Sequence, residues 1–159
     1  MKQPYFKKTL TTLFSSKHSS HTLALSTAVG VYIAFSPFPG FHTAMVFAFS
    51  WMLGLSFPLV LASSMAVNNP WTMVPVYGVG YFFGQWFLYV CDLESLYANP
   101  AWMESMNLFL AEKIGMPHIS LPAFLIGGNI LGIVFAVAAY PVVKYMCDRY
   151  AADETGDNA

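Results

Sequence analysis

Charged side chains are scarce in this chain and are missing from its middle. Its 159 residues include 7 Lys and Arg and 8 Asp and Glu, and residues 18–91 contain none of these four types. The charged fraction is 9% and the hydrophobic fraction 57%, whereas a soluble domain averages about 25% charged residues. Because one membrane span needs only about 20 apolar residues, the composition predicts an integral membrane protein.

Cysteines and acidic partners are also scarce, which argues against several kinds of chemistry. Cys91 and Cys147 are far apart and have neither the spacing of a metal site nor that of a disulfide framework. In the charge-free block, His42 and scattered serines have no acidic partner, so no catalytic constellation is visible. The net charge of −1 gives no basic patch. We therefore expect no enzyme, no metal or other cofactor, and no nucleic-acid partner.

The few basic residues predict the orientation. Lysines precede the first apolar segment, Lys144 and Arg149 follow the last, and only Lys113 lies between, so the positive-inside rule places both termini in the cytoplasm. The expected organisation has three parts: a cytoplasmic amphipathic tail (1–18), a single helical membrane domain (19–147) with an external acidic loop (92–118), and an acidic disordered tail (148–159).

Proline, glycine and asparagine divide the apolar block into helices. We expect an all-α, polytopic membrane bundle with proline-broken helices. The expected helices are 19–36, 41 to a break at 54–58, that break to 68, 71–90 and 119–143. The helix at 71–90 is expected to have a kink at Pro75. An external interfacial helix is expected between Asn99-Pro100 and Gly115. The two middle pieces are shorter than a full crossing.

These middle pieces have two interpretations. A continuous helix over 41–67 would be about 40 Å long and would separate its two ends across the membrane. A break near Pro58 instead lets the pieces fold back as a re-entrant hairpin, and the sequences at its two ends then meet.

Two glycine pairs predict close helix packing. Gly80 and Gly84 are four residues apart in one expected helix, and Gly128 and Gly132 are four apart in another. This spacing lets helix backbones approach each other in lipid.

Two motifs combine broken backbone with neutral polar side chains, at 36–43 and 68–75. At membrane depth, irregular backbone is tolerated only where it is buried in protein or lines a water-filled cavity, and paired broken segments are typical of a transporter site. Alternatively, each motif is a surface turn with Trp71 and His42 as interface anchors. The candidate substrate-binding residues are Ser36, Pro37, Gly40, His42, Thr43, Asn68, Asn69, Pro70, Thr72 and Pro75.

The same motifs resemble a known family. The run from Gly30 through Ser36-Pro37-Phe38-Pro39-Gly40 to Thr43, followed by Asn69-Pro70-Trp71-Thr72, Pro75, Tyr77 and Gly84, is similar to the bacterial membrane family called domain of unknown function 2062. The resemblance implies a small inner-membrane protein whose domain is sometimes attached to glycosyltransferase-like domains. It supplies no established activity or ligand. The family core would map to Pro37, Gly40, Thr43, Asn69, Pro70, Thr72 and Pro75.

Two functions remain open. The first is a carrier-like protein with a neutral polar site for an anionic or lipid-linked substrate, such as a lipid-linked phosphate or sugar. The second is a non-transporting scaffold that associates through its glycine faces with itself, as a homo-oligomer, or with an envelope glycosyltransferase. Both have the lipid bilayer as a partner.

Overall fold

The computed structural model describes residues 19–38, 40–93, 98–114 and 119–156. Every element among them is an α-helix, which confirms the all-α fold class. The helices are α2 (Ser20–Phe35), α3 (His42–Leu53), α4 (Phe57–Val67), α5 (Met73–Val90), α6 (Ala101–Ile114) and α7 (Leu121–Gly156). The amphipathic tail expected at 1–18 lies outside the described residues.

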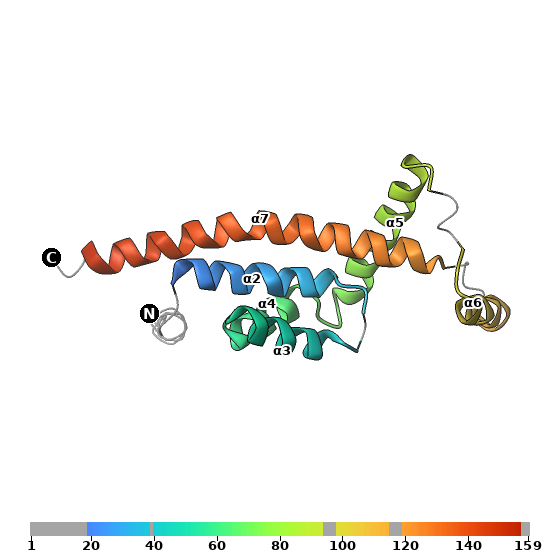
Figure 1. Ribbon diagram of the computed structural model, residues 1–159, viewed down its shortest axis with the longest axis horizontal. Coiled ribbons are helices and arrows are strands. Elements are labelled where there is room, and N and C mark those ends of the chain that lie inside the picture. Colours follow the sequence, from blue (N-terminus) through green and yellow to red (C-terminus); the bar gives the residue numbers. More distant parts are fainter. Residues whose placement is uncertain (1–18, 39, 94–97, 115–118, 157–159) are drawn as a thin grey trace.

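Helix α2 is the centre of the bundle, with α7 along one side and α4 along another (Figure 1). Helices α2 and α7 are antiparallel, since the rings of His21 and Tyr140 are 5.7 Å apart at one end while Gly132 lies against Tyr32 near the other. At this second end, the Tyr32 hydroxyl donates to Asn129 Oδ1 at 2.8 Å. A polar pair therefore fixes the register of the two helices.

Helices α3 and α4 form a hairpin against α2, not a continuous helix over 41–67. The turn is made by Gly54, whose φ of 61° is left-handed, a conformation that glycine adopts readily. Ser56 then starts α4, and its backbone N–H donates to Ser26 Oγ of α2 at 3.1 Å. At about 18 and 17 Å, the two arms are each shorter than a hydrocarbon core of about 30 Å.

Small residues bring α2 and α4 close together. A Cβ built on Gly30 would lie 2.5 Å from the Val60 carbonyl oxygen, so this contact requires a glycine. Beside it, the hydrophobic core joins α2 to both arms of the hairpin and to its turn, through the buried residues Ile33, Val46, Leu55 and Val60.

Helix α5 crosses α7 through glycines (Figure 1). A Cβ on Gly80 would lie 3.4 Å from Gly128 Cα, and one on Gly84 would overlap the Ala123 carbonyl oxygen. Gly128 and Gly132 also face α2, against Phe35 and Tyr32. Pro75, where the sequence predicted a kink, is the third residue of α5. Helical N–H groups have no intrahelical partner at this position, so the proline removes no hydrogen bond from the helix.

Helix α6 lies crosswise to α7 near the start of that helix (Figure 1). Its ends agree with the signals at Asn99-Pro100 and Gly115. Asn107 holds it to the following segment, donating to the Ile119 carbonyl at 2.9 Å and accepting from the Ile119 N–H at 3.2 Å. Asn99 bonds the same segment, donating to the Ile119 carbonyl and accepting from the Leu121 N–H.

Helix α7 extends beyond its expected end at residue 143, to Gly156. Residues 148–156, which belong to the tail predicted to be disordered (148–159), are therefore helical in the structure. Lys144 and Asp148 form an ion pair at 2.8 Å one helical turn apart, an arrangement that supports helix. Of the helices in the described ranges, α7 is the one long and apolar enough to cross a membrane, over Leu121–Tyr150.

Candidate functional site

A cavity of about 390 Å³ lies between the hairpin and the start of α5. The first motif contributes Gly40, His42 and Thr43 to its lining, and the second contributes Asn68, Asn69 and Pro70. The hairpin brings the two motifs together by returning the chain at Gly54. Six of the ten candidate residues therefore line one cavity.

Asn68 connects the helices around this cavity. Its Nδ2 donates to the Ala34 carbonyl of α2 at 2.9 Å, and lies 3.2 Å from His42 Nε2 of α3 and 3.1 Å from the Tyr77 hydroxyl of α5. Because only a nitrogen can face the Ala34 carbonyl, this contact determines the orientation of the amide. Asn68, the C-cap residue of α4, thus joins four helices through one group.

Asn69 holds the turn that begins α5. Its Oδ1 accepts from the backbone N–H groups of Trp71 at 2.9 Å and Thr72 at 3.1 Å. Thr72 closes the turn from the other side, since its hydroxyl donates to the Val67 carbonyl at 2.6 Å and accepts from the Asn69 N–H. These bonds satisfy backbone groups that a broken helix leaves without partners.

Four helix ends meet at the cavity, so its electrostatics depend on backbone dipoles rather than on charged side chains. Helices α2 and α4 end there, and α3 and α5 begin there. The N-terminal ends carry partial positive charge and the C-terminal ends partial negative charge. At α3, the N-cap residue Phe41 makes no side-chain cap bond. The lining includes the half-buried His42 and no Lys, Arg, Asp or Glu.

Four candidate residues do not line the cavity. Ser36 is fully buried and bonds Met45 Sδ at 3.6 Å, while Pro37 lies against Gly128 of α7. Thr72 is used in the turn described above, and Pro75 is exposed in the first turn of α5.

Several lining residues were not among the candidate residues. Tyr77 was not predicted as a site residue, although it follows Met73 at helical spacing and so shares its face. The remaining ones come from the hairpin arms and α5, where nothing in the sequence distinguishes them from core positions: Val46, Leu61, Ser64, Met65 and Met73. The cavity is thus lined by both polar and apolar residues.

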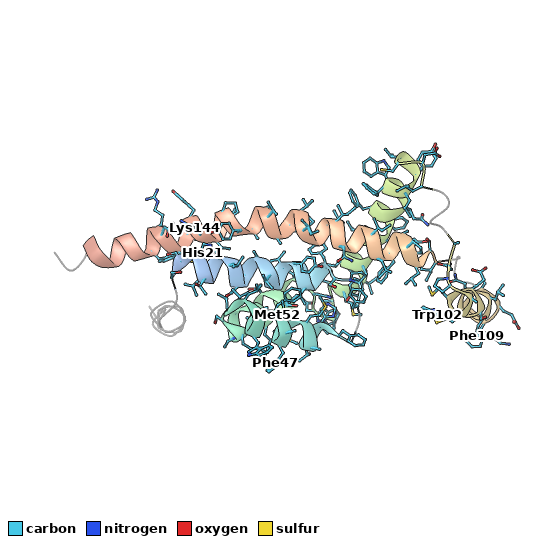
Figure 2. All side chains as sticks on the ribbon, viewed as in Figure 1. His21, Phe47, Met52, Trp102, Phe109 and Lys144 are labelled. Carbon is cyan, nitrogen blue, oxygen red and sulfur yellow. The ribbon has the colours of Figure 1, made fainter. Side chains whose placement is uncertain are left out.

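Large apolar side chains cover the outside of the bundle (Figure 2). Phe47 and Met52 on the hairpin are 66% and 70% exposed, and Trp102 and Phe109 on α6 are 60% and 58% exposed. Further exposed side chains extend this surface over α5 and α7, namely Val79, Phe82, Trp86, Tyr89, Ile133, Val134, Phe135 and Val137. Soluble monomers rarely expose such continuous apolar area.

No group of three or more His, Cys, Asp or Glu that could hold a metal ion occurs in the part of the chain that the structure describes.

Comparison with known proteins identifies the family. The chain matches, over residues 3–155, the family described as "Uncharacterized protein conserved in bacteria (DUF2062)". It therefore belongs to this family of uncharacterised bacterial proteins, as the motifs predicted. No curated protein and no solved structure matches the chain.

Proposed function

We propose that this protein is a multi-pass protein of the bacterial inner membrane that binds an anionic, lipid-linked substrate in the cavity between α3, α4 and α5, as a carrier does. Both termini face the cytoplasm in this proposal, the loop at 92–118 is external, and the hairpin re-enters the membrane. The charge-free block, the apolar exterior and the length of α7 support the membrane location.

The cavity at the junction of two broken segments is the observation that carries the proposal. Helix ends that meet inside an apolar bundle are typical of transporter sites, where N-termini point at anionic groups. The polar lining residues, such as Thr43 and Asn69, suit a phosphate or sugar, and the apolar ones, such as Leu61 and Met65, suit an attached lipid chain. Both parts of a lipid-linked substrate thus have matching surfaces.

The scaffold alternative has lost its main support. It depends on glycine faces that are free to pair with another protein, but Gly80, Gly84, Gly128 and Gly132 all pack against helices of the same chain. The carrier interpretation is therefore the better supported of the two.

Thr43 provides the sharpest test of ligand contact. Its hydroxyl lines the cavity and has no hydrogen-bond partner among the described residues, so Thr43→Val removes a polar contact without breaking a bond of the fold. We would titrate the purified protein in detergent with a short-chain isoprenyl phosphate, using calorimetry. One neutral hydrogen bond contributes about 0.5–1.5 kcal/mol, so affinity should fall roughly two- to tenfold.

Two further variants make this test specific. Thr27→Val makes the same change on α2, where the hydroxyl bonds the Leu23 carbonyl, and should leave affinity unchanged. Asn69→Asp keeps the cap but adds a negative charge to the cavity, and should abolish binding by repulsion. Binding of the probe to Thr43→Val and Asn69→Asp as tightly as to wild type, or no binding to wild type, would refute an anion site here.

A further inference from the structure

His42 is unusual among the residues of the cavity. Residues 18–91 contain no Lys, Arg, Asp or Glu, and among the lining residues His42 is the one whose ordinary pKa allows its charge to change near neutral pH. Ionisable residues inside membrane proteins are costly, and they mark proton and ion pathways.

The hydrogen bonds around His42 fit the neutral ring. Asn68 Nδ2 has two hydrogens, and the Ala34 carbonyl at 2.9 Å takes one of them. The other points toward His42 Nε2 at 3.2 Å and the Tyr77 hydroxyl at 3.1 Å. The Tyr77 hydroxyl lies 3.4 Å from the same Nε2 and can donate to it while accepting from Asn68. With no proton on Nε2, both hydrogens of Asn68 Nδ2 and the hydroxyl hydrogen of Tyr77 face acceptors.

A proton on Nε2 disrupts this network. The ring nitrogen becomes a donor that faces the donor amide of Asn68, and Tyr77 can no longer donate to it. Tyr77 can accept from the protonated ring only if its own hydrogen turns elsewhere. The hydrogen bond between His42 of α3 and Asn68 of α4 is thereby lost.

The neighbouring helices contain few other groups that could respond to pH. In α3, His42 is the sole ionisable side chain, and α4 contains none. Helix α2 has His21 at its opposite end and Tyr32. Helix α5 has Tyr77, Tyr81 and Tyr89, and α7 contacts Tyr77 through Phe124. Tyrosines ionise near pH 10, which leaves His42 to act near neutrality.

We propose that His42 is the proton-binding site of the cavity: the neutral imidazole holds α3, α4 and α5 together, and its protonation opens the cavity and places there the positive charge that an anionic ligand requires. Ligand binding would then be coupled to the uptake of a proton by Nε2 and ligand release to its loss. The ligand part rests on the proposed function, but the opening step does not.

Hydrogen exchange measured by mass spectrometry tests the opening step without any ligand. The full chain would be reconstituted in phosphatidylethanolamine–phosphatidylglycerol vesicles and studied from about pH 5 to about pH 8, the range in which histidine titrates. After correction for intrinsic exchange rates, protection of the hydrogen-bonded amides of α3, from Met45 onward, should fall roughly tenfold at the acidic end. Peptides from α7 provide the internal reference.

Two variants separate His42 from other causes. His42→Gln keeps a hydrogen-bonding side chain that cannot titrate, and its protection should not depend on pH. His21→Gln makes the same change at the exposed histidine near Tyr140, and should behave as wild type. A loss of protection in His42→Gln equal to that of wild type would overturn the proposal.

A second measurement keeps the test decisive if His42→Gln does not fold. The imidazole of His42 in the wild-type protein can be titrated by NMR with labelled histidine, and single His→Gln changes at His18, His21 and His118 assign the His42 signal by elimination. The midpoint of that titration should coincide with the midpoint of the loss of protection. A ring that titrates while exchange in α3 stays constant would show that protonation does not open the cavity. Neither result depends on whether an isoprenyl phosphate binds.

Discussion

The glycine contact between α5 and α7 allows a quantitative test of the fold. A Cβ on Gly84 would overlap the Ala123 carbonyl oxygen and lie 2.7 Å from the Ala123 carbonyl carbon. Both atoms belong to the backbone, so no side-chain rotation relieves the overlap. Overpacking costs about 1–3 kcal/mol, and a clash with backbone should reach the upper end. Alanine stabilises a helix by about 1 kcal/mol relative to glycine, so the net destabilisation of Gly84→Ala should be about 2 kcal/mol.

The same helix provides the control. Gly78 has no atom within 4 Å of a built Cβ, so Gly78→Ala should gain up to about 1 kcal/mol from helix propensity alone. The two variants should therefore differ by about 3 kcal/mol, a difference measurable by thermal unfolding in detergent, with Gly84→Ala below wild type. Equal melting temperatures for the two variants would mean that α5 and α7 do not cross at Gly84, and the reasoning would fail.

Two further predictions concern asparagines. Asn69→Ala should lower the free energy of unfolding in detergent by about 1 kcal/mol, because it removes a cap. Asn69→Asp should stay near wild type, because a carboxylate accepts the same bonds from Trp71 and Thr72. Equal destabilisation of both variants would contradict this capping role. Asn107→Leu should speed amide exchange in α6, because the helix loses its two hydrogen bonds to Ile119 and Asn99 alone still bonds the Ile119 carbonyl. Ser105→Ala on the exposed face is the control, and unchanged exchange in Asn107→Leu would show that α6 is held otherwise.

Much of the helix pattern could be predicted from local signals. Pro58 occupies the first turn of α4, and Asn99-Pro100 precedes α6, because proline lacks an N–H that a first turn does not need. Such signals act within a few residues, so one sequence is enough to read them. The end of α7 was missed because the tail was judged by its acidic composition, although Lys144 and Asp148 are four residues apart, a spacing that supports helix.

The contacts that build the site were harder to predict. The sequence placed Asn68 in a motif, but its partners Ala34 and Tyr77 lie on α2 and α5, and no local rule specifies which helix faces which. Similarly, Gly128 was predicted to pack, yet it contacts both α2 and α5, and Gly127 supplies the backbone next to Gly84. Partner choice depends on how the helices cross, which glycine spacing does not determine.

Asn68 and Asn69 line the cavity and also hydrogen-bond backbone groups at the helix ends. This double role determines which variants can separate an effect on stability from an effect on function. Asn68 and Asn69 bond backbone groups at the ends of α2 and α5, so truncating either one leaves those groups without partners at a cost of about 1–3 kcal/mol. A loss of function in such a variant has two possible causes. Thr43, by contrast, lines the cavity without a bonded partner among the described residues, and the bonds of His42 involve side chains that can turn. Changes at Thr43 therefore test the site, changes at Asn68 test the fold, and changes at His42 act on both.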